Sequence, residues 1–132
     1  MRIKLRKRGI AMVTILVVDD EKNIRTLYRK ELEKEGYTVI AVEDAEKAME
    51  VLDSEKIDLV VLDIRMPGMH GIDALEKMIV KRRDLSVLIN TAYGEYKDDF
   101  LTWLAEDYII KSSDLTHLKE KIRKVLTKKG KL

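Results

Sequence analysis

Residues 59–62 form a short, wholly apolar run that ends in Asp63 and is followed by Pro67, the only proline of the chain. A continuous apolar run of this length is typical of a strand that is buried on both faces, as in a parallel sheet covered by helices. Pro67 then ends the strand, and Gly71 opens an amphipathic segment. Asp63 is therefore predicted at the carboxyl end of a central strand, where open α/β sheets bind their ligands.

The same pattern of an apolar run followed by an amphipathic segment occurs five times along the chain. The other predicted strands are residues 14–18, 38–42, 85–89 and 107–111. Helical spacing of apolar residues predicts helices after each strand, with Gly36 ending the first, Asp44 and Asp114 capping two others, and a short helix at 96–104. Such alternation requires right-handed crossovers and gives a doubly wound α/β fold with one parallel sheet.

Composition limits the class of protein. The chain has 132 residues, no cysteine and a net charge of +2, but residues 1–12 hold five basic groups and no acid. The remainder has 21 basic and 24 acidic residues, which argues against a nucleic-acid-binding face. No apolar run approaches the roughly 20 residues of a membrane span. We therefore predict a cytoplasmic domain at 13–128, a disordered basic tail at 1–12 and a short tail at 129–132.

Polar side chains gather where the predicted strands end. Asp19 and Asp20 follow the first strand, Asp63 the third, Thr91 the fourth and Lys111 ends the fifth. If the first strand lies beside the third, these groups converge on one edge, and the carboxylates then need a proton or a cation between them. Oxygen ligands without His or Cys suit Mg²⁺. Phosphoryl transfer onto Asp63 requires a carboxylate nucleophile, a divalent ion, an ammonium and a hydroxyl, and these residues would supply them. In the competing interpretation, each residue is only a helix cap or a surface charge.

Four segments together resemble the receiver domain of two-component response regulators. They occur in the order of that family and span nearly the whole of residues 13–128: 17–21, 62–71, 90–92 and 108–111. The resemblance implies the flavodoxin-like (βα)5 fold with strand order 2-1-3-4-5. The chain is similar to single-domain receivers of chemotaxis and of sporulation phosphorelays, whose output is contact with a protein target.

The resemblance also implies a role for each site residue. Asp63 would accept a phosphoryl group from a histidine kinase or a histidine phosphotransfer protein. Asp20, Asp63 and the backbone carbonyl of Arg65 would bind Mg²⁺ directly, and Asp19 would bind it through water. Lys111 would pair with the carboxylate and then with the phosphoryl group.

Two further pairs of residues follow from the same resemblance. Thr91 would hydrogen-bond the phosphoryl oxygen and draw Tyr108 inward, changing a face made by residues 96–104, the last strand and the last helix. Arg65 and Tyr93 would stand near the approach of the attacking water and modulate the lifetime of the phosphorylated state. Because neither is a carboxylate or amide, slow self-hydrolysis is expected.

The sequence departs from the family pattern, and other functions compete with this one. Lys111 is followed by Ser112 instead of the usual proline, and a cis bond there would cost about 3 kcal/mol, so a trans bond could place Lys111 differently. An aspartate-nucleophile phosphatase is a rival, although Arg65 stands where its general acid belongs. A flavin or nucleotide carrier would need a phosphate-binding loop where the chain has acids. A receiver-fold interaction module without phosphorylation is the third alternative.

Overall fold

The computed structural model describes residues 13–64, 71–94, 97 and 100–132. The elements alternate along the chain in this order: β1 (Thr14–Val18), α1 (Lys22–Lys34), β2 (Thr38–Val42), α2 (Ala45–Ser54), β3 (Leu59–Leu62), α3 (Gly71–Lys81), β4 (Ser86–Thr91), the 3₁₀ helix η1 (Phe100–Leu104), β5 (Asp107–Ile110) and α4 (Thr116–Lys128). The strands form one sheet in the order β2-β1-β3-β4-β5, and every pairing is parallel. The predicted flavodoxin-like fold is confirmed.

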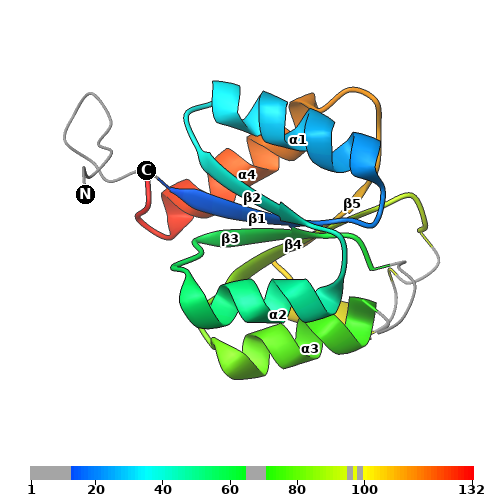
Figure 1. The fold of residues 1–132 in the computed structure, drawn as a ribbon, viewed down its shortest axis with the longest axis vertical. Helices are drawn as coiled ribbons and strands as arrows, with labels where there is room; N and C mark the ends of the chain where they lie inside the picture. The colour runs from blue at the N-terminus through cyan, green and yellow to red at the C-terminus, as the bar shows by residue number, and fades with distance from the viewer. Residues whose placement is uncertain (1–12, 65–70, 95–96, 98–99) are drawn as a thin grey trace.

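The sheet is covered by helices on both faces (Figure 1). Helices α1 and α4 lie on one face, and α2 and α3 lie on the other. Along β1 the side chains alternate between the two layers, with Ile15 and Val17 in the core beneath α1 and α4, and Leu16 and Val18 in the core beneath α2 and α3. This double burial is why β3 and residues 15–18 of β1 are apolar throughout rather than alternating.

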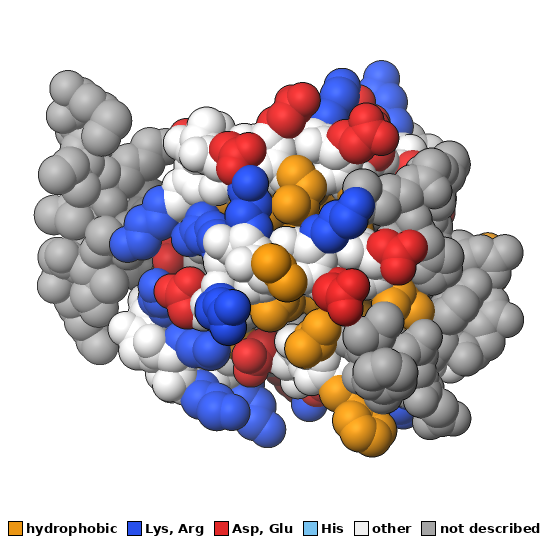
Figure 2. All heavy atoms as spheres, turned by 90° about the horizontal axis from the view of Figure 1, so that it is seen from below, with side chains coloured by type: hydrophobic (Ala, Val, Ile, Leu, Met, Phe, Trp, Pro, Cys, Tyr) orange, Lys and Arg blue, Asp and Glu red, His pale blue; other side chains and the backbone are white. Residues whose placement is uncertain are grey.

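The outer face of α2 and α3 carries charged side chains around a few apolar ones, as Figure 2 shows. Met49, Val51 and Ile79 are partly buried against the core there. No helix in the described part of the chain has both the length and the apolar character that a membrane crossing needs.

Local chemistry fixes the ends of several helices. Gly36, with φ of 97°, adopts the left-handed conformation that ends α1. The Asp44 carboxylate accepts the Lys47 N–H at 2.8 Å and caps α2. Gly71 opens α3 by donating its N–H to the Ile64 carbonyl at 3.0 Å. A side chain at position 71 would not fit, because its Cβ would lie 2.1 Å from the Ile64 Cα.

Several predicted boundaries differ from the structure, and the last strand ends at Ile110 instead of residue 111. The helix expected at 96–104 is only the 3₁₀ helix from Phe100, and part of the expected range lies outside the described residues. The fourth strand extends to Thr91 instead of ending at residue 89. Asp114 accepts the Thr116 N–H at 2.9 Å, as a capping residue does, although Leu115 is the residue at the N-cap.

Of the two predicted tails, only residues 129–132 belong to the described part of the chain. Residues 1–12 lie outside the described residues. At the other end, Gly130 has φ of 72°, and the Lys131 N–H donates to the Leu126 carbonyl at 2.8 Å. The Lys131 ammonium also lies 3.2 Å from an Asp58 carboxylate oxygen, so the segment after α4 folds back onto the domain.

Candidate functional site at the carboxyl edge of the sheet

The strand ends bring the predicted polar side chains to one edge of the sheet. Asp19 follows β1, and its N–H donates to the Val42 carbonyl at 3.1 Å. Asp63 follows β3, and its N–H donates to the Val18 carbonyl at 3.0 Å. These hydrogen bonds extend the sheet by one residue, which holds both aspartates rigidly. Both are almost fully buried, with 2% and 5% of their surface exposed.

The Lys111 ammonium bridges the two buried aspartates. It lies 2.8 Å from Asp63 Oδ2 and 2.7 Å from Asp19 Oδ2. Glu21 is a more distant third neighbour, at 3.7 Å. The Lys111–Ser112 peptide bond is trans, since the described residues contain no cis bond. The lysine reaches the site without the cis bond that proline favours in the family.

Burial and charge act against each other on these groups. Burial raises the pKa of the Asp19 carboxyl, although its hydrogen bond with Lys111 opposes that shift. Burial alone would lower the pKa of the Lys111 ammonium, but its hydrogen bonds to Asp19 and Asp63 outweigh burial and raise that pKa above its usual value. The ammonium therefore stays charged at neutral pH and compensates the buried carboxylates.

Three acidic side chains at the end of β1 could hold a cation. Asp19, Asp20 and Glu21 each offer a carboxylate oxygen, and these oxygens lie within 4.8 Å of one another. Asp19 is buried, whereas Asp20 and Glu21 are exposed. Hard oxygen donors that are partly open to solvent suit Mg²⁺, because this ion keeps several of its waters. Sequence analysis did not single out Glu21, although it belongs to the same acidic run. Asp63 is joined to this group through Lys111, which it shares with Asp19, and Arg65 lies outside the described residues.

The predicted switch residues are linked through the backbone after β4. Thr91 is fully buried, and its carbonyl accepts the Lys111 N–H at 2.7 Å. The Tyr93 N–H lies 3.4 Å from the Thr91 hydroxyl oxygen. The Tyr108 hydroxyl donates to the Tyr93 carbonyl. The loop that follows Thr91 is thus held by Tyr108, while the Tyr93 side chain is 44% exposed.

Sequence analysis missed a buried polar pair next to this site. The Asn90 amide donates to the Tyr28 hydroxyl at 2.7 Å, and both residues are almost fully buried. The bond joins the middle of α1 to the strand residue that precedes Thr91. The one signal in the sequence is Asn90, an asparagine at the end of an apolar run. Tyr28 gives no signal, because it occupies a position that the helical spacing already assigns to the core.

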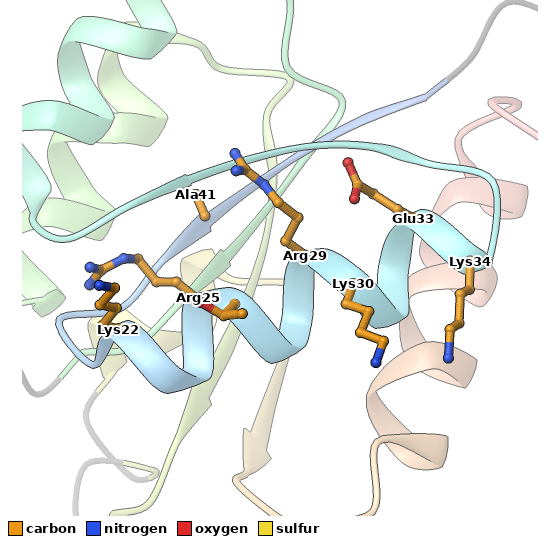
Figure 3. A pocket seen from close by; sticks show the side chains of 8 residues that line it. Lys22, Arg25, Arg29, Lys30, Glu33, Lys34 and Ala41 are labelled. Carbon is orange, nitrogen blue, oxygen red and sulfur yellow. The ribbon is translucent and has the colours of Figure 1, made fainter.

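A basic groove adjoins the acidic edge. It runs along α1 beside β2, has a volume of about 660 Å³, and is lined by Lys22, Arg25 and Arg29 with Ala41 at β2. Figure 3 shows Arg29 reaching toward β2, while Lys30 extends on the other side of the helix. The Arg25 guanidinium also donates to the Asp19 carbonyl at 2.9 Å, so the groove begins directly at the site.

Comparison with known proteins gives a consistent result. Residues 15–123 match the model of the response regulator receiver domain. The chain is 34% identical over 120 residues to sporulation initiation phosphotransferase F of Bacillus subtilis, covering 88% of this chain and 95% of that protein. It is 38% identical over 117 residues to the transcriptional regulatory protein CpxR of Escherichia coli, covering 87% of this chain but only half of that protein.

Solved structures agree with this match. The response regulator TrrA of Thermotoga maritima, in complex with Mg²⁺–BeF, superposes with a TM-score of 0.84 at 43% identity, covering 87% of this chain and all of that one. The same regulator in complex with the histidine kinase ThkA gives a TM-score of 0.82. A CheY-like receiver domain protein of Methanospirillum hungatei superposes with a TM-score of 0.87 at 29% identity, covering 92% and 98% of the two chains.

Proposed function

The chain belongs to the response regulator receiver domain family, and we propose that Asp63 is the residue on which it accepts a phosphoryl group. The supporting observation is the Lys111 ammonium, which lies within 2.8 Å of both Asp63 and Asp19 in a buried setting. An ionised Asp63 carboxylate oxygen attacks the phosphorus of a phosphohistidine as the N–P bond breaks, and the imidazole leaves with the electron pair.

The surrounding residues compensate the charge that this reaction brings in. A bound Mg²⁺ would neutralise charge on the phosphoryl oxygens. Asp20, Asp63 and the Arg65 carbonyl would hold it directly and Asp19 through water, and we add Glu21 as a further ligand. Lys111 then moves from the carboxylate toward the phosphoryl oxygens. Carboxylate oxygens at the end of β1 support a magnesium site because they are hard donors. The Mg²⁺–BeF complex of TrrA supports the same cofactor.

We further propose a histidine kinase or histidine phosphotransfer protein as the phosphoryl donor. TrrA is known in complex with the histidine kinase ThkA, and another relative is a sporulation phosphotransferase. We propose that the protein acts in the cytoplasm and passes its signal to a protein target. Thr91 and Tyr108 would report phosphorylation to that target, because Tyr108 holds the loop that follows Thr91.

Two side chains near Asp63 and Thr91 in the sequence bear on the lifetime of the phosphorylated state. Tyr93 is large and 44% exposed next to Thr91, and Arg65 lies outside the described residues. Neither side chain is an acid or amide that would orient water, so we propose slow self-hydrolysis. An Arg65→Asn, Tyr93→Glu double variant is expected to lose the phosphoryl group faster than the parent.

Phosphorylation by a small acyl phosphate tests the main assignment. The protein is incubated with the donor and Mg²⁺, and the intact mass is expected to rise by one phosphoryl group. Asp63→Asn is expected to abolish labelling, and Asp20→Ala is expected to abolish it through loss of the metal. Asp73→Asn replaces an exposed acid on α3 and is expected to leave labelling unchanged. Equal labelling of Asp63→Asn would overturn the assignment.

The same assay separates the competing functions. An interaction module that has lost phosphorylation would show no added mass in Mg²⁺ even with excess donor. A phosphatase would release many equivalents of phosphate for each protein molecule with little added mass at any time. A receiver is expected to hold one phosphoryl group that persists after the donor is removed.

A further inference from the structure

A second polar cavity lies at the amino end of the sheet, opposite the proposed phosphorylation site. It has a volume of about 250 Å³ and is lined by residues at the starts of β3 and β4 and by the segment after α4. Ser86 and Thr91 are the two ends of β4, so about 16 Å separates this cavity from the carboxyl edge at roughly 3.3 Å per residue.

Cations outnumber acids around this cavity. Its lining includes four basic side chains: Lys56, Arg82, Lys129 and Lys131. The two acids are Asp58 and Asp84. Asp58 is already engaged, because its carboxylate accepts the Thr14 N–H at 2.9 Å and pairs with Lys131 at 3.2 Å. Lys129 is also paired, with Glu106 outside the lining, at 3.7 Å. Lys56 and Arg82 have no carboxylate partner among the described residues, so the lining keeps an excess of positive charge.

The Arg82 guanidinium is held in place at the rim. It donates to the Glu55 carbonyl at 3.3 Å and to the Ile57 carbonyl at 3.2 Å. Both acceptors are neutral, so these bonds fix the orientation of the guanidinium without cancelling its charge. Its remaining N–H groups can bind a planar or tetrahedral oxyanion.

The Ser86 hydroxyl is independent evidence that the cavity binds a polar ligand. Ser86 is 1% exposed and lines the cavity, and within the described part of the chain the structure gives its hydroxyl no hydrogen-bond partner. Its strand neighbour on the same face, Leu88, belongs to the core beneath α1 and α4, so the hydroxyl lies on the side of Lys129. A buried hydroxyl without a partner is costly unless water or a ligand satisfies it.

We propose that this cavity binds a tetrahedral oxyanion of the phosphate class, either free phosphate or the phosphate group of a small phosphomonoester. The volume is several times the roughly 30 Å³ that one water occupies in the liquid, so a lone water would leave it largely unfilled. Ser86 donates its hydroxyl hydrogen to the anion, and Arg82, Lys129 and Lys56 supply the charge. The inference does not rest on the proposed function, since Asp63 takes no part in it.

An NMR titration of the full chain with inorganic phosphate tests the proposal. A chelator removes metal so that the acidic edge cannot bind phosphate through a cation, and chloride is adjusted to hold the ionic strength constant. We expect saturable shifts of the Ile57, Ser86 and Lys131 amides, with Thr91 unchanged. Asp63→Asn is expected to bind phosphate as the parent does, which separates this result from any failure of the phosphorylation assignment.

Matched substitutions identify the contacts. Ser86→Ala and Lys129→Gln are each expected to weaken binding about tenfold, as loss of one charge-assisted hydrogen bond does. Arg83→Gln and Lys128→Gln replace the neighbouring residues, which are exposed and do not line the cavity, and are expected to bind as the parent does. Because Arg82 also holds two loops, Arg82→Gln is used only if its fold is shown to be intact.

Two results would overturn the proposal. One is a linear, non-saturating response that is the same in Ser86→Ala and Arg83→Gln, which would indicate general screening by salt. The other is saturable binding whose shifts map to Thr91 and Asp63. A second titration with glycerol phosphate distinguishes the sources of the group: tighter binding than inorganic phosphate favours a phosphomonoester, and weaker binding favours the free ion.

Discussion

The two edges of the sheet treat buried polar groups in opposite ways. At the carboxyl edge, Asp19 and Asp63 share the Lys111 ammonium at 2.7 and 2.8 Å. At the amino edge, Arg82 is bound only to neutral carbonyls and the Ser86 hydroxyl lacks a protein partner in the described chain. The first edge satisfies its buried carboxylates with one lysine, keeps an excess of negative charge, and would have to exchange its lysine contacts during phosphoryl transfer. The second is incomplete by itself, which is the condition of a site that binds a ligand.

Replacing Lys111 should cause the largest loss in the free energy of unfolding. A small loss would contradict the difference between the two edges. Lys111→Met leaves two carboxylates buried without a cation, and removing one partner of a buried pair costs about 3–5 kcal/mol. Urea unfolding in a chelator at pH 8 measures the loss. Added Mg²⁺ should restore part of the stability by replacing the missing charge. Lys119→Met, which breaks a partly exposed pair with Glu31, is the control and should lose less than about 1 kcal/mol.

The buried pair of Tyr28 and Asn90 should give the next largest effect. Tyr28→Phe removes the hydroxyl and leaves the Asn90 amide unsatisfied in the core, which costs about 1–3 kcal/mol. In a Tyr28→Phe, Asn90→Leu double variant, neither polar group remains, so much of that loss should be recovered. Urea unfolding of both single variants and the double variant forms a thermodynamic cycle. Additive losses would show that the hydrogen bond itself contributes little.

Ser86→Ala should not destabilise the protein as Tyr28→Phe does when no anion is present. The substitution removes a buried hydroxyl without a partner, so the free energy of unfolding should stay within about 1 kcal/mol of the parent or rise. In phosphate buffer the parent should gain stability through ligand binding and the variant should gain less. Thermal unfolding with and without phosphate measures both. A clear loss in phosphate-free buffer would mean that the hydroxyl already has a partner.

The ion pairs that join α1 to α4 should matter least. Glu31 with Lys119 and Glu35 with Arg123 each join α1 to α4 at 3.0 Å. Their side chains are partly exposed, so Glu31→Gln and Glu35→Gln should each cost about 0.2–1 kcal/mol, and the cost should disappear in high salt. Larger effects would show that charge alone, and not burial, sets the difference between the edges.

The fold could be predicted because its signals are local and repeated. Residues 59–62 and 15–18 are apolar throughout because both faces of their strands are covered, and that pattern alone indicates a parallel sheet. The convergence of Asp19, Asp63 and Lys111 followed from the rule that parallel strands end at one edge. The boundary at Phe100 was not predictable, because a 3₁₀ turn and a short α-helix have the same apolar spacing over one turn.

The amino-edge cavity could not be predicted from the sequence. Lys56, Arg82 and Lys129 are far apart along the chain and resemble ordinary surface charges. Ser86 starts a strand, where a serine carries no special signal. What distinguishes these residues is that two loops and the end of α4 meet around one buried hydroxyl, and only the folded backbone shows this. The contact between Asn90 and Tyr28 was hidden for the same reason.

The two glycines on either side of the carboxyl edge should have different evolutionary fates. Among the described residues, an added Cβ at position 94 meets only the Ile110 side chain, at an ordinary 3.5 Å. At position 71 it would collide with the backbone of Ile64, which no change of rotamer relieves. Under neutral drift, Gly94 is free to become alanine, whereas Gly71 cannot change without moving the start of α3 away from the end of β3. Among related proteins, glycine at position 71 should therefore be kept because the backbone requires it, whereas the residue at position 94 should vary.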